Sequence, residues 1–376
     1  MKSKIKPTTL KMENNHVTVL NIDLNAAEHN LNYFKTKLRS TTKILVVVKA
    51  FGYGSNAVTI AKHVANKVDY FAVAYLDEGI SLRKAGIKKP ILVLHPQKAN
   101  LEKIIEYNLE PNIYSFRLLK AVVKLAKNKN LNKYPIHLKF NTGLNRLGFT
   151  QKNISEITTL VNSQTGIEIT SIFSHIAASE DPNECTFTMQ QINSFNAISN
   201  ELIPILKNTP FKHMLNTSGI INYAKEAEFD MVRLGIGLYG FANEDHETKK
   251  LENVLSLSSV VSQIHIIKKG ESVGYNRAYK ALKPIKTATI PIGHADGISR
   301  QFGNGVGYVY INNKKAPIIG NVCMDMIMVD ITNIDCNEGD IVLIYKNQQH
   351  IVHLAQSIHS IPYELLTAIS QRIKRS

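Results

Sequence analysis

A single lysine follows one of the most apolar stretches of the chain, where its amine could become reactive. Lys49 comes directly after Ile44–Val48 and precedes the segment Ala-Phe-Gly-Tyr-Gly. Apolar neighbours disfavour the charged ammonium, which lowers its pKa and frees the amine for Schiff-base chemistry. An isolated lysine at a strand end usually just reaches solvent. However, Gly52 and Gly54 allow close approach of the backbone around Tyr53, so Lys49 is a candidate for carbonyl chemistry.

A glycine-rich segment, Arg233–Gly240, could hold a phosphate group. Glycines at a helix start expose backbone N–H groups, which bind anions. The same pattern also suits a simple tight turn, so it is weak evidence alone. Thr217 and Ser218 could donate hydroxyl groups to the same phosphate.

Short β-branched runs alternate with helical stretches between residues 17 and 240. Asn25–Lys37 and Phe116–Lys127 show helical spacing of apolar residues. Eight strands, each followed by a helix, predict a parallel (β/α)8 TIM-like barrel, with a doubly wound open sheet as the alternative. The strand-like runs are Ile44–Val48, Tyr70–Ala74, Ile91–Leu94, Glu110–Ile113, Ile136–Phe140, Ile167–Phe173, Phe211–Leu215 and Asp230–Val232.

Polar residues follow these strands, at the end where barrel enzymes build their sites. His175 would be a structural histidine if taken alone, but together these residues predict a site for an anionic ligand. The residues at the strand ends are Lys49, Lys139, Arg146, His175, Asn216, Thr217, Arg233 and Gly235.

The pattern changes after residue 248 to alternating or apolar runs with little helix between them. We therefore expect two domains, a barrel over residues 1–248 and a mostly β domain over residues 249–376. The first ~14 residues are expected to pack with the second domain. Asn312-Asn313 and Glu338-Gly339 supply turns, and a closing helix is expected near Val352–His359.

The composition is that of an ordinary folded protein with a basic bias. The 376 residues are 44% hydrophobic and carry a formal net charge of +15. The lysines are scattered rather than gathered on one face, so no nucleic-acid partner is expected. Three widely spaced cysteines fit neither a disulfide framework nor a zinc cluster, which favours the cytoplasm. No apolar stretch is long enough to cross a membrane, and no secretory signal is visible.

Several motifs together resemble the bacterial alanine racemases, a family that depends on pyridoxal 5'-phosphate. The similarity covers nearly the whole chain. The matching segments are Val48–Gly54, Lys139–Gly148, Ser174-His175, His213–Thr217, Arg233–Gly240, Val273–Tyr275, Ile290–Gly297 and Cys323–Asp325. The resemblance implies a (β/α)8 barrel, a C-terminal β domain, and a homodimer with shared active sites that supplies D-alanine for peptidoglycan.

The resemblance also implies roles for individual residues. Lys49 forms the Schiff base with the cofactor, and Tyr275 reaches in from the other subunit as the second base. The cofactor-binding residues would be Lys49, Tyr53, His175, Asn216, Thr217, Arg233, Gly235 and Ile236. Arg146 would bind substrate, together with Met324 and Asp325 of the other subunit. Lys139 matches a lysine that is often carbamylated in the family, and no metal is implied.

Racemisation is consistent with these residue types. The α-proton leaves one face of a planar intermediate and returns on the other, so two proton-handling groups must oppose each other. Nearby positive charge would favour the Tyr275 phenolate. An arginine at the pyridine nitrogen keeps that nitrogen unprotonated and should limit side reactions such as transamination.

Three residues depart from the family pattern. His294 stands where tyrosine is usual, Asn141 replaces an aspartate, and the segment with Gln371 lacks a tyrosine that often contacts the phosphate. These changes bear on rate and cofactor affinity and leave a broader-specificity amino-acid racemase open. A decarboxylase of related fold and a non-enzymatic pyridoxal-phosphate carrier are the remaining alternatives. Tyr275 argues against the decarboxylase, and the second domain argues against the carrier.

Overall fold

The protein divides into two compact units. In this computed structural model residues 16–376 are described. One unit spans Asp23–Val254, and the other contains Leu255–Ser376 together with the described residues up to Ile22. The division after Val254 lies six residues beyond the boundary expected at 248. The expectation that the first ~14 residues pack with the second domain lies outside the described residues.

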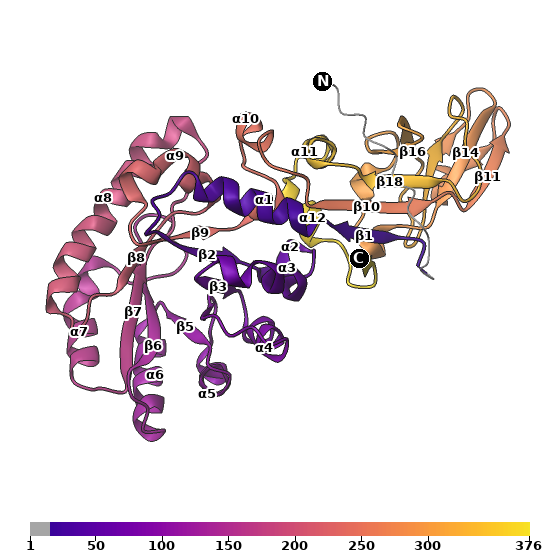
Figure 1. Cartoon of the computed structure of the whole chain (residues 1–376). Coiled ribbons are helices and arrows are strands. Elements are labelled where there is room, and N and C mark those ends of the chain that lie inside the picture. Colours follow the sequence, from indigo (N-terminus) through magenta and orange to yellow (C-terminus); the bar gives the residue numbers. More distant parts are fainter. Residues whose placement is uncertain (1–15) are drawn as a thin grey trace. The chain divides into compact units, whose positions relative to one another are not determined.

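The Asp23–Val254 unit is a closed parallel barrel of eight strands, as predicted (Figure 1). Strand β2 pairs in parallel with both β3 and β9, which closes the sheet and excludes the open doubly wound alternative. The strands are β2 (Lys43–Val47), β3 (Tyr70–Val73), β4 (Ile91–Val93), β5 (Glu110–Ile113), β6 (Tyr134–Lys139), β7 (Ile167–Phe173), β8 (Phe211–His213) and β9 (Met231–Leu234).

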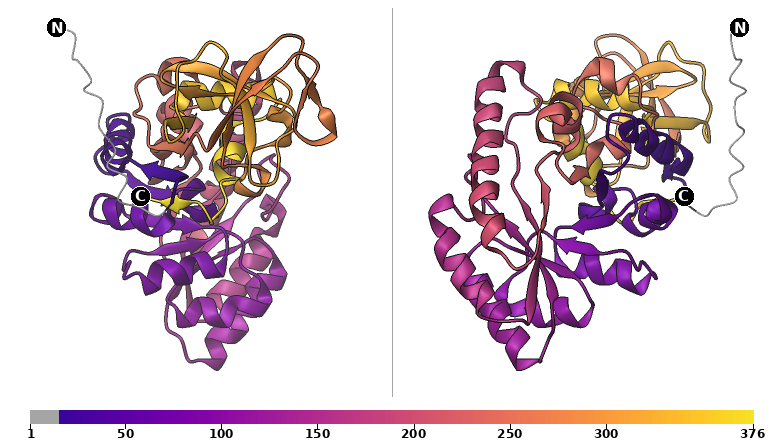
Figure 2. Two further views of the ribbon diagram at one scale, coloured as in Figure 1. Left: turned by 90° about the vertical axis from the view of Figure 1, so that its right-hand side faces the viewer. Right: turned by 60° about the vertical axis from the view of Figure 1, so that its left-hand side comes forward.

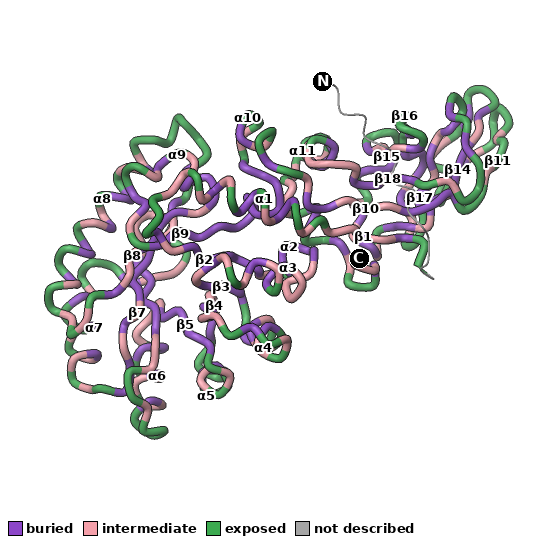
Figure 3. The backbone as a smooth tube through the Cα atoms, viewed as in Figure 1, coloured by how far each residue is buried: buried purple, intermediate pink, exposed green. Residues whose placement is uncertain are grey.

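Helices surround the barrel strands, and their apolar faces are buried against them (Figures 1 and 3). In α6 the buried residues Leu118, Val122 and Ala126 recur at helical spacing. The Ser115 hydroxyl accepts a hydrogen bond from the Leu118 N–H and caps the start of this helix. The helices are α1 (Leu24–Lys35), α2 (Lys49–Tyr53), α3 (Ala57–Val64), α4 (Leu76–Lys84), α5 (Leu101–Glu106), α6 (Phe116–Asn128), α7 (Ile154–Asn162), α8 (Cys185–Leu202), α9 (Thr217–Ala227) and α10 (Asp245–Thr248).

The second unit is built on a nine-stranded sheet in the order β11-β14-β17-β16-β15-β18-β10-β1-β19, with a separate pair β12-β13. Most of this unit is drawn in orange and yellow in Figure 2. Asn312 and Asn313 have φ values of 47° and 62° and form the predicted turn between β15 and β16. The strands are β1 (Val19–Ile22), β10 (Leu255–Val260), β11 (Gln263–Ile267), β12 (Ser272–Val273), β13 (Tyr279–Lys280), β14 (Ile285–Ile290), β15 (Tyr308–Ile311), β16 (Lys314–Ile319), β17 (Ile327–Asp330), β18 (Ile341–Tyr345) and β19 (Lys374–Arg375).

Three details of this unit differ from the expectation. Strand β1 belongs to its sheet, because it pairs antiparallel with β10 and parallel with β19. The run Ile318–Asp330 is interrupted by a loop between β16 and β17. The predicted closing helix is α11 (Gln348–Ser357), and a further helix, α12 (Pro362–Thr367), follows it. In the described part of the chain, no helix has the length and apolar character needed to cross a membrane.

Candidate active site

Lys49 lies where β2 ends, at the start of a short turn with unusual backbone geometry. Ala50, Phe51, Gly52 and Tyr53 all have φ values between 52° and 65°. This left-handed conformation costs conformational free energy for residues other than glycine. Such strain is found where a functional site needs a fixed geometry. The turn buries Tyr53 beside Tyr239, with ring centroids 4.7 Å apart.

The amine of Lys49 is destabilised as an ammonium. Burial is the largest cause that lowers the pKa of Lys49, and the positive charges of Arg146 and Arg233 lower it further. Glu78 acts in the opposite direction through its negative charge. The desolvation inferred from the sequence is therefore present, and a larger share of Lys49 is neutral than of an ordinary lysine.

Lys139, Arg146 and His175 lie in the same electrostatic environment as Lys49 and Arg233. Burial lowers the pKa of Lys139 to about 8, with further contributions from Arg233, Arg146 and Lys49. Burial also lowers the pKa of His175 well below its usual value, again with Arg233 and Lys139 contributing. Within residues 16–376 no group of acidic, histidine or cysteine side chains could hold a metal ion. This concentration of positive charge suits an anionic ligand.

Arg233 is the centre of the site and is almost fully buried. It lies inside β9 rather than after it, and its guanidinium donates to four neutral acceptors. Nη1 donates to His213 Nδ1 at 2.8 Å, and Nη2 contacts the carbonyl oxygens of Ser174 and Met214 at 2.8 Å and His175 Nδ1 at 2.9 Å. Its Nε–H donates to no acceptor among the described residues, so it is available to a ligand.

The glycine-rich segment and the start of α9 form a small cradle. The Thr217 hydroxyl accepts from the backbone N–H groups of Gly235 and Gly237, each at 3.2 Å. A Cβ on Gly235 would lie 2.7 Å from the Tyr53 hydroxyl, so only glycine leaves this space open. Ile236 begins a short 3-10 helix over Ile236–Tyr239, which is the helix start expected in this segment. Because the Thr217 oxygen accepts these two bonds, its hydroxyl hydrogen remains to be donated to a phosphate.

Asn216 is the N-terminal cap of α9. Its side-chain oxygen accepts from the Gly219 N–H at 2.9 Å and the Ser179 hydroxyl at 3.1 Å, which caps α9. Asn216 thus orients Thr217 at the first turn of α9.

The remaining predicted residues belong to the second unit. The Tyr275 side chain is 74% exposed, and its phenol has no hydrogen bond to the described residues. Its carbonyl accepts from Asn321, at the start of the loop that carries Met324 and Asp325. Met324 is also exposed, whereas Asp325 accepts from Arg372 Nη2 at 2.6 Å. Arg372 Nε bonds Asp296 at 2.6 Å, so one arginine holds two carboxylates.

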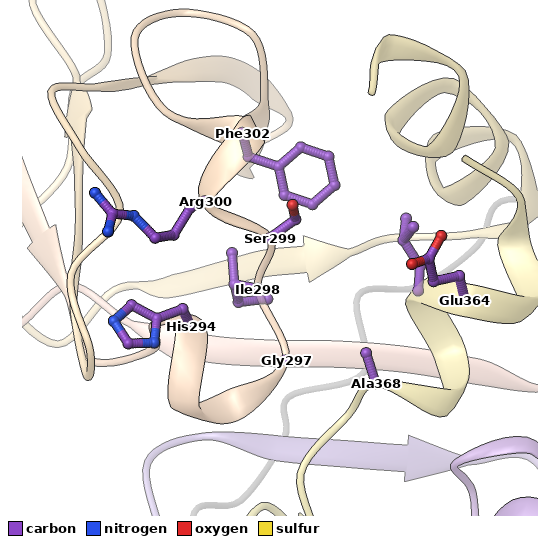
Figure 4. Close-up of a pocket in the computed structure, with 9 residues that line it drawn as sticks. His294, Gly297, Ile298, Ser299, Arg300, Phe302, Glu364 and Ala368 are labelled. Carbon is purple, nitrogen blue, oxygen red and sulfur yellow. The ribbon is translucent and has the colours of Figure 1, made fainter. Parts of the chain in front are cut away.

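His294 lies on the loop that packs against Met324. Its backbone N–H donates to the Cys323 carbonyl at 2.9 Å, and the next N–H, of Ala295, donates to the Met324 carbonyl. His294 and Arg300 line a pocket of about 260 Å³ whose opposite wall includes Glu364 and Ala368 of the C-terminal helix region (Figure 4). His294, the position at which we expect a departure from the family pattern, therefore lines a cavity.

Sequence reasoning missed two contributors to this geometry. Glu78 accepts from the backbone N–H groups of Ala50 at 2.6 Å and Ala74 at 2.7 Å, and so ties the Lys49 turn to the end of β3. Glu78 also accepts from the Tyr75 N–H at 3.1 Å, but tyrosine is not one of the residues that mark a helix start in the sequence, so no capping signal pointed to this glutamate. Arg372 carries no such local signal, because its partners are 47 and 76 residues away.

Comparison with known proteins gives a consistent assignment across the chain. The family model for the alanine racemase N-terminal domain matches residues 22–243, and the model for the alanine racemase C-terminal domain matches residues 254–376. Alanine racemase 1 of Oceanobacillus iheyensis is 32% identical over 367 residues, covering 94% of this chain and 96% of the relative. The structure resembles alanine racemase of Clostridium difficile 630, with a TM-score of 0.90, 31% identity and 96% of each chain covered. It also resembles the Bartonella henselae alanine racemase with covalently bound pyridoxal phosphate, with a TM-score of 0.86, 29% identity, and coverage of 96% and 99%.

Proposed function

Because the chain belongs to the alanine racemase family, we propose that it interconverts L-alanine and D-alanine with pyridoxal phosphate as cofactor. The observation that carries the proposal is the buried amine of Lys49, whose pKa is lowered by burial and by the charge of Arg233. The same end of the barrel carries the glycine cradle at Gly235. The match of both domain models confirms the family resemblance that the motifs indicate.

The residues of the barrel fit the cofactor. Lys49, whose pKa is lowered by burial, would provide the amine for attachment, and the cradle of Tyr53, Thr217 and the Gly235–Ile236 backbone would hold the phosphate. The open Nε–H of Arg233 would face the pyridine nitrogen. Bound pyridoxal phosphate draws electron density from the α-carbon of an attached amino acid and so acidifies its α-proton.

Two side chains would move the α-proton. Lys49, with its lowered pKa, accepts or returns a proton on one face of the substrate. We assign the opposite face to Tyr275 of a second copy of the chain, because its exposed phenol has no partner among the described residues. The exposed Met324 and Met326 near the same loop suit burial against that copy. The proposal is thus a homodimer with shared active sites.

Charges around the site would position the substrate. Arg146 would bind the carboxylate side of alanine, with Met324 and Asp325 of the second copy nearby. The Asp325 carboxylate accepts a hydrogen bond from Arg372. Asp325 would therefore order its loop as well as lie near the substrate. His175, kept neutral by burial and by Arg233, would steady the proton-handling groups without adding charge.

Lys139 is proposed to carry a carbamate. A lysine whose pKa is lowered to about 8 is partly neutral near pH 7 and can react with carbon dioxide. The resulting negative charge would lie among Arg146, Arg233 and Lys49 and offset their mutual repulsion. Asn141, which replaces the usual aspartate, removes one negative charge from this neighbourhood. The negative charge of a carbamate would compensate for that loss.

A chiral product assay tests the activity. Purified protein with added pyridoxal phosphate should convert L-alanine to D-alanine, and serine and lysine should react more slowly. Much faster turnover of serine or lysine would favour the broader-specificity racemase. Carbon dioxide release from lysine, ornithine or arginine would indicate the decarboxylase, and cofactor binding without racemisation would indicate the carrier. We further propose a cytoplasmic location, since the three thiols, Cys185, Cys323 and Cys336, are all free.

A further inference from the structure

Five polar side chains, one from each of five consecutive barrel strands, form a continuous buried hydrogen-bonded chain, here called the barrel relay. Glu110 Oε2 lies 2.7 Å from His137 Nε2, and His137 Nδ1 lies 2.6 Å from Ser171 Oγ. Ser171 Oγ lies 2.9 Å from His213 Nε2, and His213 Nδ1 lies 2.8 Å from Arg233 Nη1. All five residues are at most 8% exposed. The relay therefore links a carboxylate on β5 to the guanidinium at the centre of the site.

The chemistry of arginine fixes the direction of every bond in the barrel relay. A guanidinium only donates, so His213 must accept at Nδ1 and carry its proton at Nε2. That N–H donates to Ser171, which leaves the serine hydroxyl hydrogen for His137 Nδ1. His137 then carries its proton at Nε2 and donates it to the Glu110 carboxylate. Burial, together with Arg233, lowers the pKa of His213 well below its usual value, which agrees with a neutral ring.

The barrel relay matters because Arg233 is a buried charge with only neutral acceptors around it. A buried cation without a nearby anion is costly. Hydrogen bonds that point the same way polarise one another, so a carboxylate at the far end makes His213 Nδ1 a stronger acceptor. The same logic applies to a carboxylate that orients a histidine in other active sites.

We propose that Glu110 is a positioning residue that acts through His137, Ser171 and His213 to orient and polarise the guanidinium of Arg233. Glu110 contacts neither substrate nor cofactor in this account. The inference rests on the proposed function, because there Arg233 faces the pyridine nitrogen. The barrel relay itself is a property of the protein without cofactor and can be tested on its own.

The first test is nitrogen NMR of ¹⁵N-imidazole-labelled, cofactor-free protein, with His137→Gln and His213→Gln used for assignment. Both rings should be neutral with the proton at Nε2. A proton at His213 Nδ1 would overturn the barrel relay. So would a protonated His137, because its Nδ1–H would then donate to Ser171 and reverse that bond.

The second test compares Ser171→Ala with Ser199→Ala in the cofactor-loaded protein. Ser199 is a matched control, since it is a buried serine of the same unit that donates to the Phe195 carbonyl at 2.7 Å. Ser171→Ala removes both hydrogen bonds that Ser171 makes in the barrel relay and should lower kcat for alanine by roughly tenfold, with KM little changed. The absorbance band of the bound cofactor should shift in Ser171→Ala only. Equal kinetics and spectra in the two variants would overturn the proposal.

Glu110→Gln provides a second variant if Ser171→Ala does not fold. Glutamine keeps an acceptor oxygen for His137 but lacks the charge, so kcat should fall in the same direction by a smaller factor. An unchanged kcat and spectrum in Glu110→Gln would overturn the role of the carboxylate. If no variant and no parent protein racemised alanine, the proposed function would fail, while the histidine tautomers would still decide whether the barrel relay exists.

Discussion

Replacing Gly235 by alanine should damage the phosphate cradle through one identifiable contact. The new Cβ would lie 2.7 Å from the Tyr53 hydroxyl but 3.6 Å from the Tyr53 ring carbon that carries it. The first distance is too short, so the phenol must move, whereas the second is an ordinary contact. The phenol hydroxyl would then no longer point at the phosphate. A hydrogen bond to a charged group contributes about 1.5–3 kcal/mol, which corresponds to a roughly 10- to 150-fold loss of cofactor affinity.

A double-mutant cycle measures this prediction. Pyridoxal phosphate is titrated by fluorescence into cofactor-free parent protein, Gly235→Ala, Tyr53→Phe and the double variant. Tyr53→Phe removes the atom with which the alanine would clash, so the double variant should bind the cofactor about as tightly as Tyr53→Phe alone. Urea unfolding of each protein serves as the control for stability. Additive losses in the double variant would refute the reasoning, because they would show that the two changes act independently.

Four further predictions concern Lys49, Tyr275, Glu247 and Lys139. Lys49→Ala should abolish racemisation in both directions together with the absorbance band of the lysine-bound cofactor; a retained band would assign attachment to another lysine. Tyr275→Phe should cripple proton abstraction from L-alanine and leave cofactor affinity nearly intact, and unchanged rates would remove Tyr275 from the mechanism. Burial raises the pKa of Glu247, but bonds from Lys250, Tyr33 and Lys37 outweigh it and bring the value to about 2. Its stabilising contribution is therefore present above its usual pKa of 4.5 and is lost as the pH falls toward 2. In Glu247→Gln the free energy of unfolding should therefore depend less on pH between 4.5 and 2 than in the parent protein. An unchanged pH dependence would refute this. Labelled bicarbonate should give a ¹³C carbamate signal that Lys139→Ala lacks and that grows as the pH rises through about 8; a signal that persists in Lys139→Ala would place the carbamate elsewhere.

The barrel could be predicted from the sequence because most of its strands are short runs rich in β-branched and other apolar residues, separated by stretches with helical spacing. Glu110–Ile113 and Ile167–Phe173 have the bounds that the β-branched runs predict. Strands β1 and β19 were not predicted, since β19 has only two residues and gains its partners from a segment more than 350 residues away. Short pieces of this kind form through tertiary pairing and leave no periodic pattern.

The candidate site likewise contains residues that the sequence could predict and residues that only the fold reveals. Residues at strand ends, such as Lys49 and Thr217, could be predicted because a parallel barrel gathers those ends. His137 and Ser171 were not singled out, although both belong to the barrel relay, because they are polar residues inside apolar strands. Only the pairing of β6 with β7, which places His137 beside Ser171, reveals their connection.

The central claim is that Lys49 and Tyr275 handle protons on opposite faces of one substrate. The most direct measurement is a crystal structure of the cofactor-loaded protein with a bound alanine analogue. We predict a dimer in which the Lys49 amine lies against one face of the analogue and the phenol of Tyr275 from the second copy lies against the other. A loaded structure in which that phenol lies far from the Lys49 cavity, in every copy, would contradict the account.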